Sequence, residues 1–329
     1  MNATRAWATL VFLALFSGAG ARAEEGTATT ESPGESATPD QAQNEPAPTA
    51  QDAGKDAKAS LATINKELTD PVSDTWSITL AQSFFRITPG NGAADRWNPR
   101  LQFLGAFPIG ITPGLDLITR PTIGLLDSQP HPVRGRPGEV DRTTAFGDII
   151  LQQLLVPRRA WIGNWIVGVG PTWIFPSGTS EWTSTHKWQV GPAGVLGYLS
   201  ENWILAGLVQ DWRSFAGSGP VSLHETSLQP IAAYFFPKGW SIAYSGDLSA
   251  VWTSATTDRY TIPIGLQIGK VVPLGSTHVK VSLAGQWMPV HPDHFGQVWN
   301  ASVVIQVLRP KLVRGTLSDP ANLRFRWEE

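Results

Sequence analysis

Three runs with alternating side chains follow one another between residues 164 and 215, each about ten to thirteen residues long. In the first run, one alternate set is apolar or aromatic and contains Trp165, Val167, Val169, Trp173 and Phe175. A tilted β-strand needs about nine to eleven residues to cross a bilayer, and tryptophan is enriched at both headgroup interfaces. The pattern therefore predicts strands of a membrane-spanning β-barrel.

The same pattern recurs to residue 309, and the connections between the runs alternate in length. The predicted strands are 75–87, 98–109, 115–126, 145–155, 165–175, 187–199, 203–215, 226–236, 240–252, 259–272, 277–288 and 298–309. Longer polar connections such as 127–144 alternate with tight ones such as 200–202. Bacterial outer-membrane barrels combine an even number of strands with long extracellular loops and short periplasmic turns. We therefore place the long connections outside the cell.

The predicted fold class is all-β, namely a transmembrane antiparallel up-and-down β-barrel of about 12 strands. A closed barrel satisfies every backbone hydrogen bond in lipid, which an open sheet cannot do. The alternative, a soluble β-sandwich, would bury its tryptophans in mid-strand. The aromatic residues expected at the membrane interfaces are instead near strand ends: Trp165, Trp173, Trp188, Trp203, Trp212, Trp240, Trp252, Tyr260, Trp287 and Trp299. Trp203 and Trp212 lie an odd number of residues apart in one predicted strand, so without a bulge one of them must point inward.

The side chains that alternate with the lipid-facing ones along each strand are expected to line the lumen. The polar ones are Arg100, Gln102, Arg120, Asp148, Asp247, Gln267, Lys280 and Gln286. Because both signs of charge occur, a strongly ion-selective pore is not expected. We expect Arg120, Asp148, Asp247 and Lys280 to share one polar belt. The sequence leaves open whether this belt lines a conduit or fills a narrow barrel.

The two ends of the chain lack the barrel pattern. Residues 1–23 resemble a secretory signal peptide, with Arg5, an apolar stretch and the motif Ala21-Arg22-Ala23. Residues 24–72 are predicted to be a disordered, acidic periplasmic leader rich in Ala, Pro and Thr. The barrel is assigned to 73–310 and a periplasmic tail to 311–329. We therefore expect a protein of the outer membrane of a Gram-negative bacterium, with the signal peptide removed.

Composition and motifs exclude several functions. The chain has 329 residues, a formal net charge of -2 and no cysteine, which argues against a nucleic-acid partner and a lipid-anchored lipoprotein. It has no hydrolase, P-loop, zinc-protease or dinucleotide-binding motif. The spacing in His291-Pro-Asp-His294 could suit a metal, but we interpret it as a solvated loop. We expect no cofactor, no metal site and no enzymatic activity.

Several strings in this sequence resemble successive motifs of one bacterial family. They include FGDIILQQLLVP, GVGPTWIFPSGT, KWQVGPAGVL, LVQDWRSFAG and LQPIAAYFFPKGW. The family consists of outer-membrane transporters labelled "MetA-pathway of phenol degradation", and some members are labelled neuromedin U. The resemblance extends over about residues 65–310. It implies an outer-membrane barrel that moves small organic or aromatic compounds, and it supplies no functional residues.

The sequence thus favours an outer-membrane, porin-like channel or transporter for small organic molecules, hydrophobic or aromatic ones among them. Two alternatives stay open: an outer-membrane enzyme acting on lipid or lipopolysaccharide, and a structural or sensing barrel without transport. The expected partners are outer-membrane lipids and lipopolysaccharide, a small-molecule solute and the barrel-assembly machinery.

Overall fold

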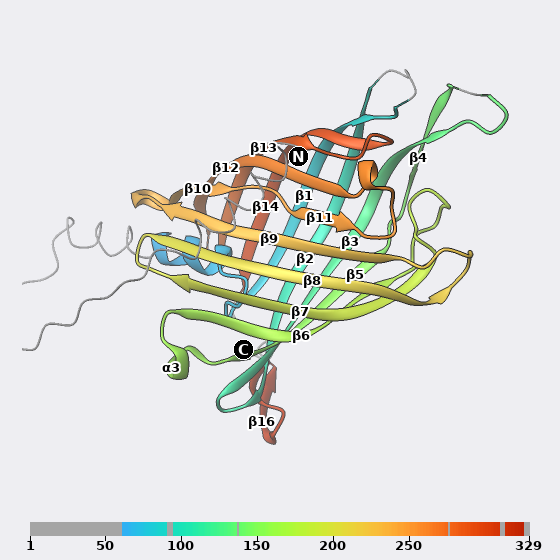
Figure 1. Ribbon diagram of the computed structural model, residues 1–329. Helices are drawn as coiled ribbons and strands as arrows, with labels where there is room; N and C mark the ends of the chain where they lie inside the picture. The colour runs from blue at the N-terminus through green and yellow to red at the C-terminus, as the bar shows by residue number, and fades with distance from the viewer. Residues whose placement is uncertain (1–60, 91–94, 137, 276, 310–312, 326–329) are drawn as a thin grey trace, which may run out of the picture. The chain divides into compact units, whose positions relative to one another are not determined.

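The computed structural model describes residues 61–90, 95–136, 138–275, 277–309 and 313–325 (Figure 1). The predicted signal peptide and the predicted leader up to residue 60 lie outside the described residues.

The strands of the barrel wall form one closed antiparallel sheet. The barrel closes because β1 (Trp76–Thr88) pairs with both β2 (Arg96–Thr112) and β14 (Gly296–Arg309). The remaining undivided strands are β3 (Leu115–Pro132), β6 (Trp165–Phe175), β7 (Lys187–Leu199), β8 (Trp203–Gly217), β9 (His224–Phe235), β12 (Tyr260–Leu274) and β13 (Thr277–Val290). Each pairs with its neighbour in sequence order.

Two further strands of the wall are each divided into two segments. β4 (Val140–Ala145) and β5 (Ile149–Pro157) pair with successive parts of β3. β10 (Trp240–Tyr244) and β11 (Leu248–Val251) both lie between β9 and β12. Counting each divided strand once gives twelve strands, so the predicted closed antiparallel barrel is confirmed.

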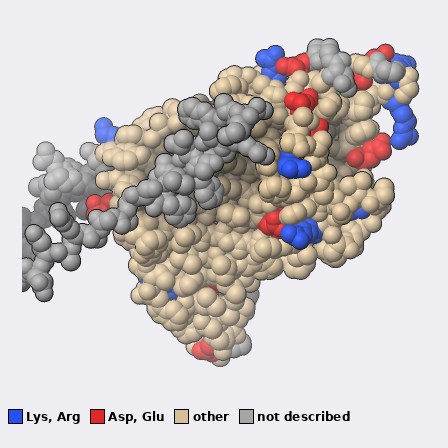
Figure 2. All heavy atoms as spheres, in the orientation of Figure 1, with Lys and Arg blue, Asp and Glu red and all other residues tan. Residues whose placement is uncertain are grey.

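The outer face of the barrel is apolar. Its exposed large side chains include Leu80, Phe84, Val169, Leu196, Leu205, Val209, Ile264, Leu266, Ile268, Leu283, Val303 and Ile305. In Figure 2 most of the visible wall is free of charged side chains, which gather toward the end with the longer loops. An apolar belt of this extent is stable in hydrocarbon and not in water, so the barrel is built to span a membrane.

Two segments outside the barrel strands are ordered, and the first of them corrects the predicted disorder of residues 61–69. Residues 61–69, assigned above to a disordered leader, form a helix with buried side chains. In the predicted tail, β15 (Val313–Thr316) and β16 (Asp319–Phe325) form a hairpin, and the N–H of Leu317 donates to the carbonyl of Gly110, 2.8 Å away. The short helices α3 (Arg159–Ile162), η1 (Pro237–Gly239) and η2 (Thr256–Asp258) lie in connections. Within the described ranges, no helix has the length and hydropathy needed to cross a membrane.

Candidate functional site: the barrel lumen

The helix over 61–69 occupies the lumen at the end that carries the short turns. Asn65 is fully buried, and its Nδ2 donates a hydrogen bond to the carbonyl of Gly239 in the β9–β10 turn (3.0 Å). The hydroxyl of Ser241 donates to the Oδ1 of Asn65 (3.4 Å). Both partners belong to the barrel wall, so this side chain fixes the helix against it.

Two inward side chains on neighbouring strands hold the last turn of the helix. Lys280 in β13 is buried, and its Nζ donates to the hydroxyl of Thr69 at 2.8 Å. Gln306 in β14 donates through Nε2 to the carbonyl of Leu68 at 2.9 Å. Lys280, predicted to line the lumen, therefore faces inward but is used to hold the helix.

An ion pair anchors the segment that follows the helix. Asp70 pairs through Oδ2 with Nη2 of Arg159 in α3, while its Oδ1 accepts the N–H of Val72 (3.1 Å). Burial raises the pKa of Asp70, although the nearby guanidinium and the N–H of Val72 act in the opposite direction. The ion pair and hydrogen bonds thus compensate the desolvation of a buried carboxylate only in part.

Beyond this segment the inner wall is apolar over several strands. Val72 packs into a buried cluster with Ile118, Leu154, Val156, Ile166, Ala193, Val195, Ile204, Ala206, Leu208, Ala233 and Phe235. The most deeply buried members, Leu154 and Ile166, have no exposed surface. The lumen of a water-filled porin is polar, so this apolar layer distinguishes the present barrel from that class.

A polar layer adjoins the apolar one. Nη1 of Arg120 donates to Oε1 of Gln152 (3.2 Å), and the side chain of Gln152 is buried. Across β6 and β8, the hydroxyl of Thr172 accepts from Nε1 of Trp212 (3.0 Å) and donates to Gln210 (3.0 Å). These hydrogen bonds lie inside the barrel, and the buried Nε2 of Gln152 has no hydrogen-bond partner among the described residues.

Trp212 requires a correction. It was expected at the membrane interface, but it is only 4% exposed and bonded within the lumen, whereas Trp203 on the same strand is 41% exposed. The two residues are nine positions apart in a regular strand, so they must face opposite sides. The other predicted interface aromatics lie on the outer wall, with Trp173 half-buried and the rest exposed: Trp165, Trp173, Trp188, Trp203, Trp240, Trp252, Tyr260, Trp287 and Trp299.

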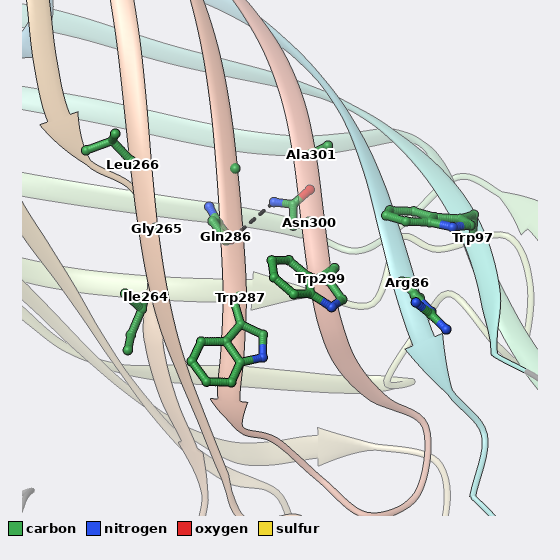
Figure 3. Close-up of a pocket in the computed structure, with 11 residues that line it drawn as sticks. Arg86, Trp97, Ile264, Gly265, Leu266, Gln286, Trp287, Trp299, Asn300 and Ala301 are labelled. Atoms are coloured by element: carbon green, nitrogen blue, oxygen red, sulfur yellow. Dashed lines mark hydrogen bonds between the residues drawn. The ribbon is translucent and has the colours of Figure 1, made fainter.

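Further inward polar residues lie around the division between β10 and β11. Asp247 is hydrogen bonded by Gln229 and interacts electrostatically with Arg120. Nε2 of Gln286 donates to the hydroxyl of Ser245 (2.9 Å), and Asn300 donates to Oε1 of Gln286 (3.2 Å; Figure 3). The wall is thus supported by side-chain hydrogen bonds where its strand pairing is interrupted.

Near the long loops, Asp148 makes hydrogen bonds to the β6–β7 loop. Its Oδ1 accepts the N–H of Gly178 (3.0 Å), and its Oδ2 accepts both the N–H and the hydroxyl of Thr185 (2.7 and 2.9 Å). These bonds tie the β6–β7 loop to the division between β4 and β5. Asp148 is therefore a loop anchor.

Arg100 is paired in the same half of the barrel. Its Nε lies 2.8 Å from Oδ1 of Asp127, and its guanidinium lies 4.6 Å from the centre of the Phe85 ring. Gln102 and Gln267 are half-buried at inward positions of β2 and β12.

The expected single belt of charges is wrong. Lys280 holds the helix at one end of the lumen, and Asp148 anchors a loop at the other. Among these four residues, as far as the described part of the chain shows, Arg120 and Asp247 are the pair that interacts electrostatically, and Arg120 also interacts with Asp70. The alternation of side chains along a strand shows whether a residue faces the lumen or the lipid. It does not give the residue's height along the barrel axis, which depends on strand tilt and stagger.

Two long loops are joined by Asp258 and His294. Oδ1 of Asp258 accepts the backbone N–H of His294 (2.9 Å), and the imidazole Nδ1 lies 3.1 Å from Oδ2. These hydrogen bonds hold the pKa of Asp258 below its ordinary value. The one from the backbone N–H of His294 has the largest effect. No group of three or more metal-ligating side chains occurs within the described ranges.

Acidification should separate these two loops. Since the pKa of Asp258 is lowered by folding, its stabilising contribution is complete above about pH 4 and is lost as the pH falls through the lowered value. Pepsin should therefore cut the loops faster as the pH falls from about 4 to 2, after correction for its activity on an unfolded peptide. Asp258→Asn should remove this pH dependence. Equal pH profiles for the two proteins would contradict the assignment.

The chain was compared with known families, curated proteins and solved structures. No family model and no curated protein matches it. Among solved structures, the COG4313 outer membrane channel from Pseudomonas putida F1 is 15% identical, with a TM-score of 0.46, 71% of this chain covered and 95% of that one. The NanC porin is 8% identical, with a TM-score of 0.41 and coverages of 69% and 98%. The toluene transporter TodX from Pseudomonas putida is 10% identical, with a TM-score of 0.32 and coverages of 74% and 92%. All three likenesses are weak, and none identifies the function of this chain.

Proposed function

We propose that this protein is an outer-membrane channel for small hydrophobic or aromatic molecules, as the resemblance to the "MetA-pathway of phenol degradation" family implies. The observation that carries the proposal is the apolar layer of the inner wall around Leu154, Ile166 and Phe235. A hydrophilic solute would lose its hydration there and find few hydrogen-bonding partners.

An apolar solute gains free energy when it moves from water into this apolar layer. Burial of apolar surface contributes about 25 cal/mol per Å², so an aromatic molecule that buries about 150 Å² gains about 4 kcal/mol. The adjoining polar layer, with Arg120 and Gln152, provides hydrogen-bonding groups for a hydroxyl or carboxyl substituent. The lumen therefore suits amphipathic aromatic solutes better than sugars.

A packed barrel without transport is the second candidate. It is favoured by the contacts of Asn65, Lys280 and Gln306, which fill one end of the lumen in the structure. The two candidates differ in whether a solute can reach the apolar layer and pass it.

Uptake by whole cells separates the candidates. Cells with the chain should take up a radiolabelled monoaromatic acid or hydrocarbon at least ten times faster than cells without it, while uptake of a disaccharide should not change. Leu154→Asn places an amide in the apolar layer and should lower aromatic uptake about tenfold, which corresponds to about 1.4 kcal/mol. Leu155→Ala, on the neighbouring outward position, is the matched control.

Heat-modifiable electrophoretic mobility must first show that both variants form the barrel. Equal aromatic uptake with and without the chain would refute the channel and favour the packed barrel. Disaccharide uptake that rises as much as aromatic uptake would instead indicate a general porin.

A further inference from the structure

A groove of about 680 Å³ opens on the outer face of the barrel (Figure 3). Its floor includes Gly285 in β13 and Ala301 in β14, which face each other directly in the strand register. Leu266 is paired with Gly285 on one side, and Phe84 is paired with Ala301 on the other. Leu266 and Phe84 are large and about half exposed, so the two small residues leave a depression in the apolar belt.

The end of the groove nearer the long loops is aromatic and basic. Trp287 and Trp299 are paired in register and stacked with ring centres 6.2 Å apart. The next residues in the same row are Arg86 and Trp97, on β1 and β2. Nη1 of Arg142 in β4 donates to the carbonyl of Trp97 at 3.4 Å. Two guanidinium groups therefore flank Trp97 at this rim.

These guanidinium groups are accessible to an anion. Arg86 has a side chain 45% exposed and pairs with Asp95 at 3.1 Å. Arg142 is exposed and makes no ion pair with any residue that the structure describes. Guanidinium groups bind phosphate with two parallel hydrogen bonds, and basic residues at an interface attract anionic lipid headgroups.

We propose that this groove binds a phosphorylated glycolipid of the outer leaflet, with an acyl chain over Gly285 and Ala301 and a phosphate on Arg86 and Arg142. The order of groups along the groove matches the order of groups in such a lipid: small apolar residues at the depth of the chains, tryptophans at the interface and guanidinium groups at the headgroup. The proposal rests on the proposed outer-membrane location, because the row of Trp287 and Arg86 lies toward the long loops. It does not depend on which solute passes through the lumen.

The test measures binding of bisphosphorylated lipid A to the purified, detergent-solubilised full chain by native mass spectrometry. Arg86→Gln combined with Arg142→Gln should weaken binding at least tenfold, and dephosphorylated lipid A should bind the unaltered protein at least tenfold more weakly. Arg213→Gln, an exposed arginine on a distant strand, is the control and should have no effect. Equal affinity for the phosphorylated and dephosphorylated lipids would overturn the proposal.

A second variant tests the position of the acyl chain. A Cβ added at Gly285 would meet no atom within 4 Å, so there is open space for a side chain, and Gly285→Leu should fold while it fills the groove. It should weaken binding of both forms of lipid A at least fivefold, whereas Gly194→Leu, at another open outward position, should not. Unchanged binding in Gly285→Leu, or phosphatidylglycerol bound as tightly as lipid A, would refute the glycolipid site. Aromatic uptake by whole cells reports on the channel alone, so failure of one proposal can be distinguished from failure of the other.

Discussion

Replacement of Asn65 by alanine should increase the ion conductance of the reconstituted barrel. In the structure Asn65 is fully buried and connects the helix to Gly239 and Ser241 of the wall. Loss of a buried hydrogen-bonding partner costs about 1–3 kcal/mol, and every 1.4 kcal/mol changes an equilibrium tenfold. The fraction of barrels with the helix displaced should therefore rise about 5- to 150-fold. Single-channel recordings in planar bilayers should show correspondingly more frequent open events.

Lys66→Ala is the matched control for this experiment. Lys66 belongs to the same helix, and its described hydrogen bond uses only its backbone carbonyl, which accepts the N–H of Asp70. Its replacement changes helix propensity little and should leave conductance unchanged. If Asn65→Ala conducts no more than this control, the helix does not limit passage, and the wall side chains themselves close the lumen.

The strands could be predicted because their outward positions obey one physical rule. A side chain in contact with lipid must be apolar, and successive side chains alternate between the two faces, so period two appears directly in the sequence. β6 and β7 begin and end at the predicted residues, 165–175 and 187–199. Closure follows because an open edge cannot be stable in lipid.

The division between β10 and β11 has a local cause that sequence alone indicates only in part. Pro263 on the neighbouring strand has no N–H to donate, so the ladder is interrupted opposite it. Gly246 there has a φ of 146°, and a Cβ at this position would lie 2.5 Å from the Pro263 ring. The strand therefore bends away between residues 244 and 248. The sequence shows that Pro263 lies within a predicted strand and cannot donate to the ladder, but it does not show which partner strand is divided.

The contents of the lumen could not be predicted, because they depend on contacts between distant residues. The signal for the helix was weak: Leu61, Ile64 and Leu68 recur at helical spacing in a segment otherwise rich in polar residues. Its decisive contact joins Asn65 to Gly239, 174 residues away. The apolar layer had a clearer signal, since adjacent residues such as Ile166 and Val167 are both apolar and one of them must face inward.

Substitution of arginine for Leu266 should hinder assembly of the barrel in lipid. Leu266 lies near the middle of β12, is 52% exposed and belongs to the outer apolar belt. An arginine that faces lipid at the midplane costs about 2–4 kcal/mol. The ratio of folded to unfolded protein should therefore fall about 30- to 1,000-fold, which can be measured by denaturant titration in liposomes with heat-modifiable mobility as the readout.

Gln267→Arg provides the sharpest control, because it introduces the same charge one residue further along the strand. Gln267 is half-buried between the exposed Leu266 and Ile268, so its side chain points into the lumen. Arginine there can remain hydrated or approach Asp247, and assembly should change by less than about 1 kcal/mol. Both variants add the same charge, so the difference between their losses of folding free energy reports the effect of the direction in which the side chain points. Equal loss of folding in both would mean that β12 does not present alternate residues to lipid, and the membrane assignment of this wall would then be wrong.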